Sequence, residues 1–293
     1  MAQAHRAIVS AERFAPNQAG PPVRVLLYSL RRLQGAPPLV LRIHGGGFTR
    51  FSADSFSATD VAIARMGAMV VSVDYRLAPM HPFPAAPEDC YAALCWAYDA
   101  LEIDRSRVVV TGSSAGGALA AAVSLLARDR SGPRITHQLL HVPALDDRLS
   151  TFSMQQHRRS NNGLTFEDVA EMWHVYLPPG TDRRRTSRYA APARTKALAG
   201  LPATFIQVNE LDPLRDEGLC FAQRLLRAGV PVEVYCAPGL GHGAVPGDSP
   251  VAALAQRIFD AAMLRALTER PPDARPTPGV ASRGSRQAGV PAG

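Results

Sequence analysis

Short apolar segments alternate with amphipathic ones along most of this chain. Several of the apolar segments are continuous runs of Val, Ile and Leu, which are typical of strands covered on both faces. The segments expected to form strands are Ala7–Phe14, Val23–Tyr28, Leu39–Ile43, Ala68–Asp74, Arg107–Thr111, Gln138–Val142, Thr204–Val208 and Val232–Tyr235. The segments whose apolar residues recur with helical spacing are Phe56–Met66, Pro87–Leu101, Ala115–Arg128, Phe166–Tyr176, Glu217–Ala228 and Val251–Thr268. This alternation predicts an α/β fold, with a mostly parallel eight-stranded sheet and helices on both of its faces.

Three parts of the chain depart from this alternation. The first two strand segments have no helix between them, so we expect them to pair antiparallel. Residues 149–201 separate two strands by far more than a usual crossover, and segments of this length are typically lids or insertions. Residues 271–293 are rich in Pro, Gly, Ala and Arg without periodicity, which predicts a disordered tail. The sequence therefore predicts a single domain, residues 1–270, with a cap or lid insertion at residues 149–201.

Composition and charge exclude several classes of protein. Hydrophobic residues make up 46% of the 293 residues, which is enough for a sizeable core. No apolar run approaches the roughly 18 residues that span a bilayer, and the first 17 residues lack the layout of a secretion signal. We therefore expect a cytoplasmic protein without stable membrane insertion. The net charge of +7 comes from scattered arginines rather than from a basic stripe with interleaved aromatic residues, which argues against nucleic-acid binding.

The cysteines give no sign of a metal or redox centre. Cys90, Cys95, Cys220 and Cys236 show no C-x-x-C spacing. We expect all four to be reduced and buried, and we expect no metal site.

A candidate nucleophile lies in the run Gly112-Ser113-Ser114-Ala115-Gly116, between an apolar strand segment and an alanine-rich helical segment. A G-x-S-x-G sequence at such a junction is typical of a nucleophile elbow. The glycines allow a turn too tight for residues with a Cβ, and the turn exposes the middle serine at the tip of a sheet. The elbow predicts Ser114 as the nucleophile.

A serine hydroxyl is a poor nucleophile at neutral pH, so it needs a base and a carboxylate that orients the base. His242 is the candidate base, because it alone among the histidines lies in a glycine-rich loop after the last predicted strand. Asp212 is the candidate carboxylate, because it follows a strand whose end should meet the His242 loop. Asp216 and Glu217 are rivals by residue type, although a structural role in the first turn of the next helix also explains them. The chain order Ser, Asp, His is the order of the α/β-hydrolases.

The run His44-Gly45-Gly46-Gly47 follows the predicted strand Leu39–Ile43 and offers donors for an oxyanion. Three consecutive glycines let backbone N–H groups converge without side chains in the way. In lipases and esterases such a loop acts with the N–H of the residue after the nucleophile, which is Ala115 here. A simple turn also explains a triple glycine, whereas a phosphate-binding loop is disfavoured because no G-x-x-x-x-G-K-[ST] follows.

With these motifs in place, the chain resembles the hormone-sensitive-lipase-like family of carboxylesterases, within the α/β-hydrolase fold. Six motifs carry the resemblance in the family's order across residues 7–268: His44–Phe48, Asp74–Pro79 with His81–Ala85, the elbow at Ser114, Leu145–Arg148, Asp212–Glu217 and His242-Gly243. The resemblance implies a catalytic triad of Ser114, Asp212 and His242, and an oxyanion hole formed by Gly45, Gly46, Gly47 and Ala115. It implies that the motifs at Asp74–Pro79 and Asp146–Arg148 support the ends of strands. It implies neither a metal nor an organic cofactor.

The chain departs from the family's pattern at four positions. Ser113 stands where the family commonly has an acidic residue, and Met80 stands where Glu is usual. Ala244 replaces a usual Phe, and His141 replaces a frequent Tyr. None of these departures removes a member of the triad, so they bear on substrate preference and local pKa values rather than on the reaction class.

The N-terminal part is shorter than in the family, because only 43 residues precede His44. The resemblance therefore predicts a reduced cap, built mainly from residues 149–201. A start site chosen too far downstream would leave the same sequence.

The sequence therefore predicts a serine carboxylesterase that acts on a small-molecule ester, and the resemblance implies short to medium acyl chains. An amidase, a lactonase or an acyltransferase would use the same triad. A non-catalytic small-molecule receptor on this fold would be expected to lose a member of the triad, whereas all three are present. Family members often dimerise through sheet edges and the last helix, so the resemblance leaves both a monomer and a homodimer as alternatives.

Overall fold

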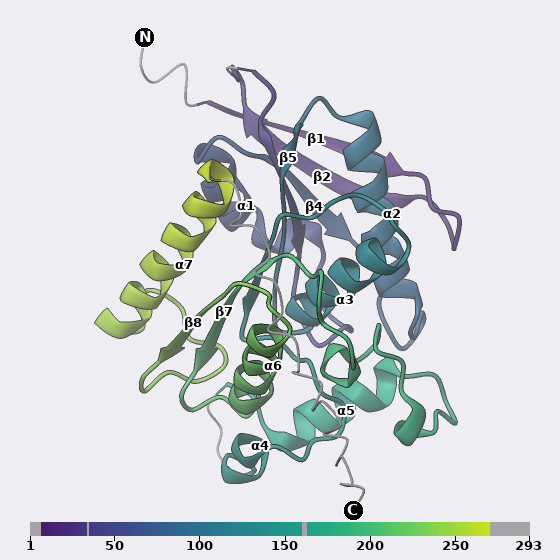
Figure 1. Ribbon diagram of the computed structural model, residues 1–293, viewed down its shortest axis with the longest axis vertical. Coiled ribbons are helices and arrows are strands. Elements are labelled where there is room, and N and C mark those ends of the chain that lie inside the picture. The colour runs from purple at the N-terminus through teal and green to yellow at the C-terminus, as the bar shows by residue number, and fades with distance from the viewer. Residues whose placement is uncertain (1–6, 34, 160–162, 270–293) are drawn as a thin grey trace, which may run out of the picture.

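The computed structural model describes residues 7–33, 35–159 and 163–269, and within them eight strands form one mixed sheet (Figure 1). The strand order is β1-β2-β4-β3-β5-β6-β7-β8. The strands are β1 (Ile8–Ala15), β2 (Val23–Leu30), β3 (Pro38–Ile43), β4 (Met69–Asp74), β5 (Asp104–Ser113), β6 (His137–His141), β7 (Ala203–Asn209) and β8 (Val232–Ala237). Strand β2 is antiparallel to β1 and β4, and the other neighbours are parallel, which confirms the predicted sheet and its antiparallel start. The predicted tail, residues 271–293, lies outside the described residues.

Helices cover both faces of the sheet (Figure 1). They are α1 (Ser57–Arg65), α2 (Ala85–Ala100), α3 (Ala115–Asp129), α4 (Phe152–Gln156), α5 (Phe166–Tyr176), α6 (Arg215–Arg227) and α7 (Pro250–Thr268). Helices α1 and α7 pack on one face through residues such as Ile63 and Met263. Helices α2, α3 and α6 pack on the other face through residues such as Leu94, Leu119 and Phe221. The sheet is therefore the middle layer of three.

The alternation of side chains along each strand explains why the strand sequences are continuously apolar. On β5, Val108 and Val110 join the core beneath α2 and α3, whereas Val109 joins the core beneath α1 and α7. Successive side chains of a strand point to opposite faces, so a strand covered on both faces needs apolar residues at every position. The predicted strands and helices accordingly match the observed ones to within a few residues.

Two details differ from the predictions. Strand β5 begins at Asp104, three residues before the expected Arg107, because Asp104 pairs with Pro38 across a register shift. The prediction that all four cysteines are buried is wrong: all four are free, but Cys220 and Cys236 are exposed. Cys236 lies on β8, the end strand of the sheet, which no further described strand covers, and Cys220 lies on α6 at the same end. One face of each of these elements meets solvent.

The described part of residues 149–201 contains α4, α5 and two short 3-10 turns. Helix α5 begins at a capping box, in which Thr165 and Asp168 bond each other's backbone N–H groups. Its buried face packs on the body of the domain: Tyr176 stacks on Phe48 with ring centroids 3.7 Å apart, and Trp173 is fully buried. This segment is therefore joined to the hydrophobic core.

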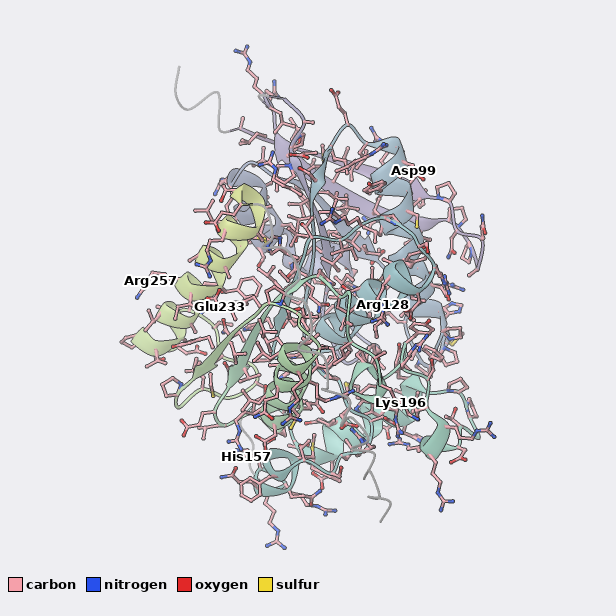
Figure 2. The ribbon with its side chains drawn as sticks, in the orientation of Figure 1. Asp99, Arg128, His157, Lys196, Glu233 and Arg257 are labelled. Atoms are coloured by element: carbon pink, nitrogen blue, oxygen red, sulfur yellow. The ribbon has the colours of Figure 1, made fainter. Side chains whose placement is uncertain are left out.

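The end of the same segment is fixed by an arginine of helix α3. Arg128, in the last turn of α3, donates hydrogen bonds to the carbonyl oxygens of Ala197 and Ala199, both at 2.9 Å. Figure 2 labels Arg128 and, below it, Lys196, which precedes Ala197 in this segment. The return of the chain towards β7 is thus held by hydrogen bonds from the Arg128 side chain to backbone carbonyl oxygens.

Replacing Trp173 with Ala should lower the free energy of unfolding by about 3–5 kcal/mol, because it leaves a large cavity between α5 and the core. The neighbouring His174 is exposed, so His174→Ala should change it by less than about 0.5 kcal/mol. Urea denaturation of both variants measures the difference. Equal stability of the two variants would show that α5 is not part of the core.

Candidate active site

Ser114 occupies a sharp turn between β5, which ends at Ser113, and α3, which begins at Ala115. Its φ of 56° and ψ of −121° lie outside the regions that residues with a Cβ favour. The chain holds this conformation from both sides: the Ser114 N–H donates to the His141 carbonyl at 2.9 Å, and the Ser114 carbonyl accepts from the Ala144 N–H at 3.1 Å. The strained turn is therefore imposed by its surroundings.

The two glycines of the elbow are required by close approaches of the backbone. A Cβ at Gly112 would lie 2.2 Å from the carbonyl oxygen of Gly116, and a Cβ at Gly116 would lie 2.3 Å from that of Ile43. No side chain fits at either position, so the G-x-S-x-G pattern follows from packing of β3, β5 and α3. The structure thus gives the elbow that the sequence predicts.

The side chains of Ser114, His242 and Asp212 form a hydrogen-bonded chain. His242 Nε2 lies 2.9 Å from Ser114 Oγ, and His242 Nδ1 lies 2.7 Å from Asp212 Oδ2. Because the carboxylate can only accept, the imidazole proton belongs on Nδ1, which leaves Nε2 free to accept the serine proton. Asp212 is only 1% exposed, so the pair of its carboxylate and His242 is shielded from solvent.

Asp212 and His242 are positioned by hydrogen bonds between the loops that follow β7 and β8. The second carboxylate oxygen of Asp212 accepts the N–H of Leu214 at 2.9 Å, which fixes the turn after the strand. Asn209 Nδ2 donates to the Gly241 carbonyl at 2.6 Å, one residue before the histidine. These contacts bring the two loops together, as the sequence predicts.

The rival carboxylates face other partners. Asp216 accepts the N–H of Ser153 at 2.7 Å and the Arg215 guanidinium at 2.7 Å. Glu217 is buried and accepts the N–H of Leu145 at 2.7 Å, and burial raises its pKa well above the usual range. Both residues lie in the first turn of α6, as the structural alternative predicts.

The glycine loop after β3 lies beside the elbow. A Cβ at Gly45 would come within 2.8 Å of the Ser113 carbonyl oxygen, and Gly46 and Gly47 have φ values of 100° and 62°. Among the hydrogen bonds of the described residues, the N–H groups of Gly46, Gly47 and Ala115 have no protein acceptor. These three groups are therefore available to an oxygen atom placed at Ser114.

Tyr75 holds the glycine loop from behind, in the motif expected to support the ends of strands. Its hydroxyl donates to the carbonyl oxygens of His44 and Gly45 at 3.0 and 3.3 Å, and its ring stacks on His44 with centroids 4.2 Å apart. Three residues further on, the Ala78 N–H donates to the Phe48 carbonyl at 2.9 Å. The motif thus acts on the loop that faces Ser114.

Sequence reasoning noted Ser113 and His141 only as departures from the family's pattern, and it missed their contact. Ser113 Oγ lies 3.0 Å from His141 Nδ1. Burial lowers the pKa of His141 to about 4, and the nearby His242 acts in the same direction. The signal that could have revealed the contact is the register, since Ser113 and His141 are paired positions of adjacent parallel strands.

A cavity of about 690 Å³ opens onto Ser114 and His242. Met172 and Val175 of α5 and the glycine loop after β3 line it on one side. Among the described residues there is no cluster of three or more His, Cys, Asp or Glu side chains that could hold a metal ion, and none of the described helices is long and apolar enough to cross a membrane.

The strand order, the elbow and the hydrogen-bonded Ser, His and Asp define this protein as an α/β hydrolase with a serine-centred site. Residues 40–246 match the family profile described as alpha/beta hydrolase fold. The chain belongs to this family, and its relatives place it among the hormone-sensitive-lipase-like carboxylesterases. The fold and family that the sequence predicts are therefore confirmed.

Two similar proteins are named as esterases. The chain is 40% identical to Esterase LipI of Mycobacterium tuberculosis over 216 residues, which are 72% of this chain and 67% of that protein. It is 40% identical to Carboxylesterase NlhH of the same species over 215 residues, which are 71% of this chain and 66% of that protein. The match thus spans about two thirds of the length of these relatives.

Among solved structures, a bacterial heroin esterase superposes with a TM-score of 0.86 at 39% identity, covering 89% of this chain and 85% of that one. Esterase LipW from Mycobacterium marinum superposes with a TM-score of 0.81 at 37% identity, covering 91% of this chain and 84% of that one.

His141 gives a prediction for the pH dependence of stability. As pH falls from about 6.5 to about 4, the unfolded chain takes up a proton on His141 while the folded chain does not, so stability is lost in this window. His141→Gln should remove this loss, which amounts to at most about 3 kcal/mol. Urea denaturation at pH 4.5 and 7 measures it. The idea fails if the variant and the wild type lose the same stability between these pH values.

Proposed function

We propose that the protein is a serine carboxylesterase that hydrolyses esters of small molecules with short to medium acyl chains, through an acyl-enzyme on Ser114. The observation that carries this proposal is the chain of hydrogen bonds from Ser114 Oγ through His242 to the buried Asp212 carboxylate, at 2.9 and 2.7 Å. Both distances lie in the range that proton transfer needs.

In the first half of the reaction, Ser114 Oγ attacks the ester carbonyl carbon while His242 Nε2 takes the hydroxyl proton. The carbonyl oxygen becomes an oxyanion, which the N–H groups of Gly46, Gly47 and Ala115 stabilise, with Gly45 as a further member of the same loop. His242 then gives the proton to the leaving alcohol, and the acyl group stays on Ser114. Asp212 stabilises the imidazolium that exists between these two proton transfers.

In the second half, water takes the place of the alcohol. His242 accepts a proton from the water, which attacks the acyl carbonyl, and the same N–H groups stabilise the second oxyanion. His242 then returns the proton to Ser114 Oγ as the carboxylic acid leaves. Each proton transfer in this mechanism is between the substrate or water and groups of this chain, so the mechanism requires no metal or cofactor.

The substrate class rests on the cavity and on the relatives. A cavity of about 690 Å³ is of the size that holds a small ester. Relatives named "Arylesterase" and "Ethyl acetate hydrolase" are 35% and 32% identical to the chain, which supports small esters as substrates. Amides, lactones and transfer to an alcohol acceptor remain alternatives for the same triad, and product analysis with each substrate type distinguishes them.

We also propose that residues 149–201 form the reduced cap of a single domain that spans residues 1–270. Helix α5 supports this, because it is anchored in the core and lines the cavity with Met172 and Val175. A homodimer stays a prediction, and a measurement of the molecular mass of the protein in solution tests it.

Replacing Ser114 with Ala should reduce the turnover of p-nitrophenyl butyrate by a factor on the order of 10⁶, because no other nucleophile is in place. The wild type should be labelled at Ser114 by a fluorophosphonate, and the variant should not. Ser124→Ala is a matched control, since Ser124 lies in α3, which follows Ser114, and its hydroxyl donates to the Ala120 carbonyl. Retained turnover by the Ser114 variant, with Ser124→Ala active, would exclude Ser114 as the nucleophile.

Asp212→Asn should reduce kcat by a factor on the order of 10⁴, because an amide at this position favours the wrong tautomer of His242. Asp216→Asn should cost less than about tenfold, since Asp216 bonds Ser153 and Arg215 instead. Steady-state kinetics on one ester compares the two variants at equal folded fraction. Equal losses would mean that Asp212 does not orient His242.

A further inference from the structure

One face of the sheet becomes polar towards the carboxyl ends of its strands. On β3, Val40 belongs to the core beneath α1 and α7, and Arg42, two residues later, points to the same face. On β5, Val109 belongs to this core, and Thr111 and Ser113 follow it on the same face. Polar side chains in a strand covered on both faces lower the stability of the fold unless they form hydrogen bonds within the protein or bind a ligand.

The register of the strands gathers these polar side chains into one patch. Arg42 pairs with Thr111 across β3 and β5. Ser113 pairs with His141 across β5 and β6, and the two side chains are 3.0 Å apart. The patch therefore lies directly beneath the elbow that carries Ser114.

The cavity at the triad reaches this patch. Arg42, Thr111, Ser113 and His141 line the same cavity as Ser114 and His242. On the helix side, Ile63 of α1 and Phe259 of α7 line it. A substrate bound at Ser114 can therefore extend one of its parts towards Arg42.

Arg42 has donor capacity that the protein does not use. Its side chain is buried, with a residue exposure of 8%, and its one hydrogen bond within the described chain runs from Nη1 to the Ile43 carbonyl at 2.9 Å. Its Nε lies 3.6 Å from Asp60 Oδ1, which is an ion pair without a hydrogen bond. A guanidinium has five N–H donors in a planar fork, so most of them stay available to an acceptor in the cavity.

The charges around Arg42 favour a neutral acceptor over an anion. Asp60 is fully buried beside the guanidinium and offsets its positive charge. His141 adds no charge near neutral pH, because burial lowers its pKa to about 4. A carboxylate in this patch would lose its hydration without meeting a net positive charge. A carbonyl or ether oxygen can accept from Arg42 at a smaller desolvation cost.

We propose that the polar patch formed by Arg42, Thr111, Ser113 and His141 is a substrate subsite, in which Arg42 donates a hydrogen bond to a neutral oxygen of the ester. This inference rests on the proposed function, because it assigns a substrate preference to the same site. The preferred substrates are esters that carry an additional oxygen atom outside the reacting ester group. This oxygen belongs to a ketone, an ether or a further ester, in the part of the substrate that enters this side of the cavity.

The first test uses the wild-type enzyme and isosteric substrates. In the acyl arm, p-nitrophenyl 4-oxopentanoate is compared with p-nitrophenyl pentanoate and with mono-p-nitrophenyl succinate, which places a carboxylate at the position of the ketone. In the alcohol arm, 2-methoxyethyl acetate is compared with butyl acetate. Each kcat/KM is divided by the rate constant for alkaline hydrolysis of the same ester, except that the succinate is corrected for its spontaneous hydrolysis at the assay pH.

We expect the neutral polar ester to exceed its alkyl isostere by on the order of tenfold or more in one arm, and that arm identifies which part of the substrate reaches Arg42. A ratio near one in both arms overturns the proposal. A preference for the succinate over the ketone also overturns it, since the acceptor would then be an anion.

The second test assigns the preference to Arg42. Arg42→Met keeps a long apolar chain and removes the donors, so the ratio of polar to alkyl ester should fall at least about tenfold. Arg42→Lys keeps one ammonium and should recover part of the ratio. Arg65→Met is the matched control, because Arg65 is exposed on α1 and does not line the cavity, and its ratio should equal that of the wild type.

The outcomes separate this inference from the proposed function. If Arg42→Met does not fold, the ratios of polar to alkyl ester for the wild type and for Arg42→Lys still test the proposal. If Arg42→Met lowers kcat/KM for both esters equally, Arg42 has only a structural role and the proposal fails, while the esterase assignment stands. If the wild type hydrolyses no ester in either arm, or Ser114→Ala retains turnover, the proposed function itself fails.

Discussion

The close approach of β3, β5 and α3 around Ser114 is the constraint on which the rest of the site depends. Gly116 lies so near the end of β3 that a Cβ would come within 2.3 Å of the Ile43 carbonyl oxygen. The glycine loop that follows β3 is thereby placed beside Ser114, and α3 begins at the next residue, Ala115. One packing requirement therefore produces both the strained serine, with a φ of 56°, and the position of the glycine loop next to it.

A second theme is the separation of carboxylates that lie close in sequence. Asp212, Asp216 and Glu217 fall within six residues, yet each has a different environment. Asp212 pairs with His242, Asp216 pairs with Arg215, and Glu217 accepts a backbone N–H in a buried position where its pKa is raised. The Asp212 carboxylate is thus left as the acidic group that contacts the imidazole.

The sheet itself forms part of the cavity. The face beneath α1 and α7 is apolar at Val40 and Val109. It is polar two residues further along the same strands, at Arg42 and Thr111. The change occurs at the carboxyl ends of parallel strands, where α/β proteins place their ligands. The core and the cavity wall are therefore continuous, and a side chain two residues beyond a core position faces the cavity.

Local sequence patterns determined the order of strands and helices, the elbow at Ser114 and the glycine loop, because each depends on neighbouring residues and on the small size of glycine. The order of motifs also indicated Asp212 and His242. Tertiary structure decided which carboxylate meets the histidine 30 residues away, that Ser113 contacts His141 28 residues away, and that Arg42 lines the cavity. These contacts depend on the register and spacing of strands distant in the chain, which residue type and periodicity do not specify.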